Sequence, residues 1–209
     1  SDVYKRQSVD DEPRTISGKC GDNAEWSYNT GTKVLTISGS GAVDRAVDSD
    51  TSKQKIEGLA EPYEVKERIT CSVKEIKIEE GITALAVSNL FGNVSKDEDA
   101  EEIKLSLPDS LERINANTFA PTTDAAYIRT IHLPRNVRYI EGGAFWGLGA
   151  TDTSDTFNEN LTITVDSKNP YYMTENNVLF TKDEKTLVYY PVEKLSLIHI
   201  SEPTRLGMI

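Results

Sequence analysis

The chain has 209 residues, with 23 Lys and Arg side chains against 34 Asp and Glu side chains, which gives a net charge of −11 at pH 7. A chain this acidic, without a local cluster of Lys and Arg, is not expected to bind nucleic acid by neutralising phosphates. Its apolar content of 37% suffices for one elongated core, and no apolar run reaches the roughly 18 residues that a membrane-spanning helix requires. We therefore expect no nucleic-acid partner and no membrane insertion.

The two ends of the chain are related through their possible coding sequences. SDVYKRQ at 1–7 can be encoded by TC-AGATGTGTATAAGAGACAG, and LSLIHI at 195–200 by CTGTCTCTTATACACATC; over their shared length these strings are reverse complements. The string resembles the transposase recognition end of sequencing-library adapters, and SEPTR at 201–205 continues the same adapter. We expect 1–7 and 195–209 to be translated adapter on an internal fragment of environmental origin, and such segments are excluded from fold reasoning.

Residues 17–43 carry the pattern of a β-hairpin. Trp26 and Tyr28 precede the Gly-containing loop 29–32, and Val34, Thr36 and Ser38 alternate after it. The following stretch, 44–61, is polar and without a sustained period, as is typical of a loop. We assign 8–60 to a β-rich N-terminal segment followed by this polar loop.

Residues 61–194 repeat one apolar template, in which five apolar positions keep the same offsets in each copy. The first anchors lie at positions 76, 105 and 131, which are 29 and 26 residues apart, and a fourth unit opens 32 residues later at position 163. The copies are Ile76-x-Ile78-x3-Ile82-x2-Leu85-x4-Leu90, Leu105-x-Leu107-x3-Leu111-x2-Ile114-x4-Phe119, and Ile131-x-Leu133-x3-Val137-x2-Ile140-x4-Phe145. Such a period predicts a solenoid of about four units.

Within each unit, the first two anchors predict a strand, and the strands of successive units should pair in parallel as one ribbon. Pro108 and Pro134 follow this strand in the second and third units and should end it, because proline cannot donate to a ladder. Short turns or single helical turns are expected on the opposite side. Segments 178–180 and 187–189 flank the turn 181–185 and predict a closing hairpin. The predicted class is a mainly β solenoid between two hairpins.

The repeat segments LPDSLERINANTF at 107–119 and LPRNVRYIEGGAF at 133–145 resemble the BspA-like leucine-rich-repeat proteins of bacterial surfaces. The final part, 163–191, is similar to the last repeat of that family, and 17–43 is similar to its preceding β-rich segment. One departure is Thr118-Phe119, where the family has Ala-Phe. The resemblance implies a leucine-rich-repeat solenoid in a secreted or surface-attached protein that binds host or bacterial macromolecules. The family motif carries no catalytic residue.

The chain offers few groups for catalysis or metal binding. His132 is the one histidine outside the adapter-like ends, and it falls at an outward strand position without a motif that supplies a nucleophile. Cys20 and Cys71 are in separate segments, so two independent buried thiols are expected, and with one histidine they do not make a zinc site. The acidic run 97–102 lacks calcium-loop spacing and indicates a solvated loop. We expect no enzyme, no metal and no cofactor.

The outward side chains of the predicted ribbon form the candidate binding surface. The central row is Lys77, Ser106, His132 and Thr164, and the flanking row is Glu75, Lys104, Thr130 and Thr162. We expect a monomeric module that binds a protein or glycan on a host or bacterial surface. Two alternatives stay open: a structural stalk, or an accessory repeat region attached to an enzyme domain outside this fragment.

Overall fold

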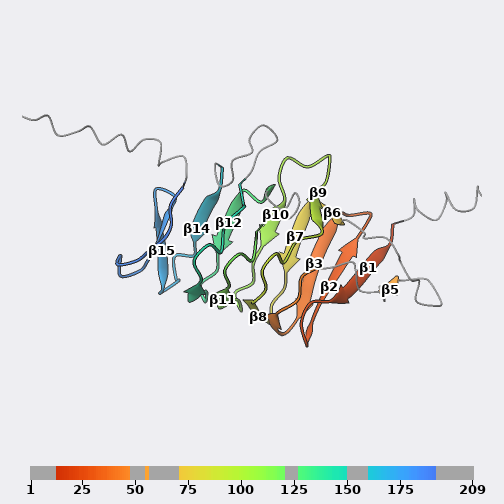
Figure 1. The fold of residues 1–209 in the computed structure, drawn as a ribbon, viewed down its shortest axis with the longest axis horizontal. Helices are drawn as coiled ribbons and strands as arrows, with labels where there is room; N and C mark the ends of the chain where they lie inside the picture. The colour runs from red at the N-terminus through yellow and green to blue at the C-terminus, as the bar shows by residue number, and fades with distance from the viewer. Residues whose placement is uncertain (1–12, 48–54, 57–70, 121–126, 150–159, 192–209) are drawn as a thin grey trace, which may run out of the picture.

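The computed structural model describes residues 13–47, 55–56, 71–120, 127–149 and 160–191, which form strands and turns without an α-helix (Figure 1). The class is therefore mainly β, as predicted. The adapter-like ends, 1–7 and 195–209, lie outside the described residues, as does most of the polar loop.

The described chain begins with an antiparallel meander of β1 (Thr15–Lys19), β2 (Ala24–Asn29) and β3 (Val34–Gly39). This confirms the predicted hairpin. The residues of β3 that face the core are, however, not the alternating Val34, Thr36 and Ser38 that the sequence pattern indicated. Trp26 lies opposite Ile37 and Tyr28 opposite Leu35, and all four are buried. Directly opposite residues of antiparallel strands share a face, so Leu35 and Ile37 face the core in place of the neighbouring Val34, Thr36 and Ser38. Strand β5 (Lys55–Ile56) pairs with the outer side of β1.

Strand β3 also begins a series of parallel strands. It pairs with β7 (Glu75–Ile78), which pairs with β10 (Lys104–Ser106), so that Leu35, Ile76 and Leu105 lie in register. A separate ladder joins β12 (Thr130–Leu133) to β14 (Thr162–Val165), with Ile131 opposite Ile163. The pairings of β7 with β10 and of β12 with β14 confirm the predicted register, whereas the pairing of β3 with β7 was not predicted.

The single continuous ribbon that we predicted is wrong, because the hydrogen-bonded ladder stops between β10 and β12. The two strands are still neighbours, as Figure 1 shows. The backbone near this junction bonds differently: the amide of Ile103 donates to the carbonyl of Tyr127 at 3.1 Å. The amide of Ile103 is thereby satisfied outside the regular strand pairing.

A second parallel sheet occupies a side on which we expected turns or single helical turns. It consists of β4 (Gly41–Val43), β8 (Ile82–Leu85), β11 (Arg113–Ile114) and β13 (Tyr139–Ile140). A third, shorter ladder joins β6 (Cys71–Val73) to β9 (Val94–Lys96). Segments this short can form strands because the backbone of the preceding unit supplies their hydrogen-bond partners. The units therefore stack through parallel strands on more than one side.

The core lies between these sheets. Phe91, Phe119 and Phe145, one from each repeat, are stacked with ring centroids 6.0 and 6.4 Å apart. Cys20 and Cys71 are buried and unbonded, which confirms two independent thiols. Burial raises the pKa of each thiol to about 12.

The C-terminal end of the core is closed by a three-stranded antiparallel sheet of β15 (Tyr172–Glu175), β16 (Val178–Thr181) and β17 (Leu187–Tyr189). The predicted hairpin corresponds to β16 and β17, and β15 extends it. The ring of Tyr189 meets Phe145 edge-on, with centroids 6.2 Å apart. The hydroxyl of Tyr172 accepts from the amide of Ile140 at 3.1 Å and donates to the carbonyl of Arg138 at 3.2 Å, so it satisfies the edge of β13.

The buried side chain of Asn169 connects this cap to the third repeat. Its amide nitrogen donates to the carbonyls of Pro134 at 2.9 Å and Val137 at 3.0 Å. Its oxygen accepts from the amides of Tyr171 at 2.8 Å and Tyr172 at 2.9 Å. The side chain is thus fully hydrogen-bonded although the residue is only 1% exposed.

Candidate binding surface

The structure places the eight predicted surface residues on four parallel strands, at matching positions. In the central row Lys77 lies beside Ser106 and His132 beside Thr164; in the flanking row Glu75 lies beside Lys104 and Thr130 beside Thr162. Because the ladder stops between β10 and β12, the rows are two pairs of strands side by side. We name the outward face of these strands, with that of β3, the ribbon face.

Seven of the eight predicted residues are exposed, and Glu75 is half-buried. The alternate positions Ile76, Ile131 and Ile163 are buried, as strand geometry requires when one side covers a core. Leu105 is less covered than these three. The ribbon face is therefore the solvent side of the parallel strands, and its side chains are available to a ligand.

The polar side chains of the ribbon face contact one another along and across the strands. The ammonium group of Lys77 lies 3.6 Å from a carboxylate oxygen of Glu75, two residues earlier on the same strand. The Nδ1 atom of His132 is 2.9 Å from the hydroxyl of Thr164 on the next strand. These contacts position the side chains, while their exposure leaves hydrogen-bonding groups open to solvent.

Two further members of the ribbon face lie on β3, which sequence reasoning assigned to the N-terminal segment. Thr36 is in register with Lys77 in the central row, and Val34 with Glu75 in the flanking row. The signal that could have identified them is Leu35-x-Ile37, which repeats the first two anchors of the template. It was hidden because β3 also belongs to the hairpin with β2. The parallel strands thus begin before residue 61.

The contacts of His132 differ from those of a catalytic triad. The ring of His132 contacts the hydroxyl of Thr164, and a hydroxyl does not orient and charge-stabilise an imidazole as the carboxylate of a catalytic triad does. Among the residues that the structure describes, no group of three or more His, Cys, Asp or Glu side chains could hold a metal ion. The acidic run 97–102 forms a loop as predicted, but the expectation that it is solvated is wrong for its first residue, because Asp97 is buried. Within the described ranges, no helix is long and apolar enough to cross a membrane.

No family model matches, and no curated protein matches either. Among solved structures, the chain is similar to a leucine-rich repeat protein from Eubacterium ventriosum ATCC 27560, with 19% sequence identity and a TM-score of 0.41 over 85% of this chain. It is also similar to the pneumococcal vaccine antigen PcpA, with 15% identity and a TM-score of 0.32 over 84% of this chain.

The matched regions span 51% and 56% of the lengths of those two chains, so this chain corresponds to about half of either protein. At these scores the likeness does not carry a functional argument. The assignment of repeats and the candidate surface depend on the parallel ladders of this chain itself.

Proposed function

We propose that this chain is the repeat region of a BspA-like leucine-rich-repeat protein, a solenoid that acts as a secreted or cell-surface binding module. The observation that carries the proposal is the register of the ribbon face. Exposed polar side chains from parallel strands form rows over a continuous apolar layer. Its ligand is a protein or glycan on a host or bacterial surface, and binding requires neither a cofactor nor a catalytic step.

An extended face of this kind suits a macromolecule better than a small molecule. Small ligands bind in concave, mostly apolar sites that cover most of their surface. The ribbon face instead offers hydroxyl, imidazole and ammonium groups spread over neighbouring strands that are about 4.8 Å apart. A polymer can contact many of these groups at once, and repeat proteins use such extended surfaces for binding.

The proposal is tested by measuring binding of the purified chain to a panel of immobilised host matrix proteins and peptidoglycan. Retention of at least one of them at micromolar concentration is expected. A variant with Lys77→Ala, His132→Ala and Thr164→Ala should lower the affinity at least tenfold, about 1.4 kcal/mol. A control variant, Lys19→Ala with Lys185→Ala, removes exposed cations that lie outside the ribbon face and should bind normally.

Two outcomes would overturn the proposal. If no member of the panel is retained at micromolar concentration, the stalk or accessory-region alternative gains support. If a ligand is retained but the ribbon variant and the control bind equally, the ribbon face is not the contact surface. Circular dichroism of each variant separates loss of binding from loss of folding.

A further inference from the structure

Asp97 is a nearly buried acid at a corner of the fold beside the ribbon face. It directly follows β9 and is only 7% exposed, while the rest of its acidic run faces solvent to a greater degree. Its amide donates to the carbonyl of Val73 at 2.9 Å, which holds it against the end of β6. A carboxylate in this position requires partners, because burial disfavours its charge.

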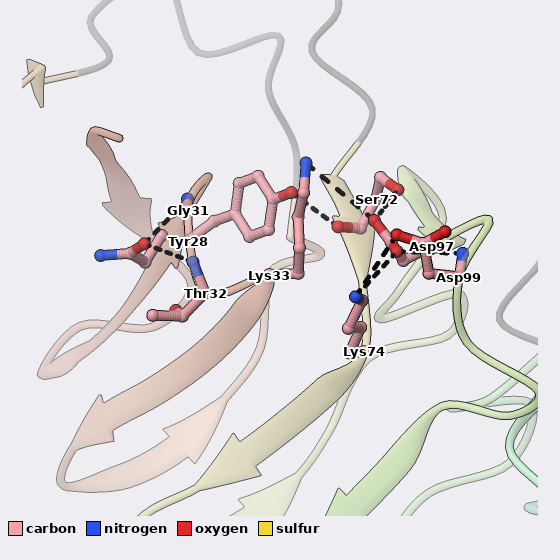
Figure 2. Close-up of polar contacts among 9 residues, drawn as sticks. Tyr28, Gly31, Thr32, Lys33, Ser72, Lys74, Asp97 and Asp99 are labelled. Atoms are coloured by element: carbon pink, nitrogen blue, oxygen red, sulfur yellow. Dashed lines mark hydrogen bonds and ion pairs between the residues drawn. The ribbon is translucent and has the colours of Figure 1, made fainter. Parts of the chain in front are cut away.

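The partners come from different parts of the chain, as Figure 2 shows. The hydroxyl of Ser72 on β6 donates to one carboxylate oxygen of Asp97 at 3.2 Å, and the amide of Asp99 donates to the other at 3.2 Å. The ammonium groups of Lys74 and Lys33 lie 3.5 and 4.0 Å from the carboxylate. Lys33 belongs to the turn between β2 and β3, and its carbonyl accepts from the amide of Lys74 at 2.8 Å. One carboxylate therefore links three segments that are distant in sequence.

The charges around Asp97 favour its ionised form. Burial by itself raises the pKa of its carboxyl, but the hydrogen bonds from Asp99 and Ser72 and the positive charge of Lys74 outweigh this and lower the pKa below the ordinary value of 3.8. Tyr28 also faces this corner, where its hydroxyl donates to the carbonyl of Ser72 at 2.6 Å. Burial, followed by the charges of Cys71 and Asp97, raises the pKa of Tyr28 to about 12. A phenol is neutral in acid with or without this shift, so Tyr28 does not change its charge when Asp97 is protonated.

We propose that Asp97 is an acid-released latch, which in its ionised form fastens the corner of β6 and β9 to the turn between β2 and β3. Protonation removes the charge that holds both lysines, and the corner then opens more readily. A carboxyl group whose pKa is lower in the folded state than in the unfolded state stabilises the folded state at any pH above its ordinary pKa. This stabilisation is lost as the pH falls through the pKa of the folded state. The release therefore falls below the ordinary carboxyl pKa of 3.8. This inference does not depend on the proposed function.

Two buried cysteines provide the means to measure this opening. Cys71 lies on β6 directly before Ser72, so opening of the corner exposes it, whereas Cys20 is in the loop between β1 and β2. Each thiol can be followed alone in a Cys20→Ser or Cys71→Ser background. The probe is 4,4′-dithiodipyridine, which reacts with thiols in acid as well as at neutral pH.

At pH 7, Asp97→Asn should raise the labelling rate of Cys71 about tenfold. Neutralising a charged hydrogen-bonding group weakens the closed state of the corner by about this factor, so the corner opens correspondingly more often. Asp99→Asn is the matched control, because its carboxylate is 86% exposed and lies 3.7 Å from the same Lys74; it should change the rate little. Lowering the pH from 6 to 3 should accelerate labelling of Cys71 in the parent chain, but much less in the Asp97→Asn variant. Cys20 should stay protected throughout.

The latch is refuted if Asp97→Asn leaves the labelling of Cys71 unchanged at pH 7, or if Asp99→Asn accelerates it equally. It is also refuted if Cys20 and Cys71 become reactive together as the pH falls, because that would indicate global unfolding. Because the comparison at pH 7 is made on folded protein, it separates the latch from acid denaturation.

Discussion

Replacing Asn169 by Ala tests how the C-terminal cap is attached to the repeats. The substitution removes four hydrogen bonds, each between 2.8 and 3.0 Å, at a residue that is 1% exposed. The carbonyls of Pro134 and Val137 and the amide of Tyr172 lose a partner in a buried setting, whereas the amide of Tyr171 is only partly buried. At about 1 kcal/mol for each lost bond, the free energy of unfolding should fall by about 4 kcal/mol.

For a domain of this size, such a loss lowers the melting temperature by roughly 8–16 °C. Thermal and urea unfolding followed by circular dichroism measure it. The matched control is Asn136→Ala, because Asn136 is exposed and makes one hydrogen bond, to the carbonyl of Asp109 at 2.7 Å. It should cost under about 1 kcal/mol. If both variants unfold at the same temperature, the hydrogen bonds of Asn169 do not stabilise the cap and our reasoning is wrong.

Three further predictions concern the edge of β13, the surface charges and the thiols. Tyr172→Phe should destabilise the fold by about 1–2 kcal/mol in urea unfolding, whereas Tyr171→Phe, at an exposed position, should have no measurable effect. Glu112 and Arg138 form an exposed ion pair, so a double-mutant cycle with Gln should give a coupling below about 1 kcal/mol that decreases with salt; a larger coupling contradicts this. Burial raises the pKa of the Cys71 thiol from 9.0 to about 12. The contribution of this thiol to the free energy of unfolding should therefore be fully present below pH 9 and decrease as the pH rises above 9. Urea midpoints between pH 8 and 10.5 should shift less for Cys71→Ala than for the parent chain, and equal shifts would contradict the prediction.

The repeat pattern could be predicted from sequence because apolar residues recur at fixed offsets. The anchors Ile131 and Ile163 lie opposite one another, as their spacing predicts. The outward row followed directly, since successive side chains of a strand point to opposite faces. The closing hairpin was equally visible, because β-forming residues on both sides of 181–185 have no other short-range pairing.

The second parallel sheet could not be predicted in the same way. Strand β11 consists of Arg113 and Ile114 alone, which is too short for alternation to appear in the sequence. Its existence depends on backbone partners in the units before and after it, Ala84 with Leu85 and Tyr139 with Ile140. These partners are brought together only by the tertiary structure, so the local sequence does not reveal them. The interruption between β10 and β12 was hidden for the same reason, since Leu105 and Ile131 keep the template.

The polar residues that connect the units were also missed. Asn169 stands before a proline in a stretch that reads as an ordinary turn, and Asp97 begins an acidic run that reads as a solvated loop. Both are buried, and both accept or donate hydrogen bonds to segments remote in sequence. Composition and periodicity indicate the local structure that a residue favours. They do not indicate which backbone group, distant in sequence, its side chain will hydrogen-bond to.

The perpendicular ring of Tyr189 has a consequence for how many units such a chain can hold. The rings of Phe91, Phe119 and Phe145 are stacked from one unit to the next, so the series can in principle be lengthened by inserting a unit between them. The ring of Tyr189 stands at an interplanar angle of 85° to that of Phe145, so the near-parallel stack does not continue through Tyr189. The terminal ring therefore acts as a stop, which leaves the number of repeats free to vary upstream while the cap is kept unchanged.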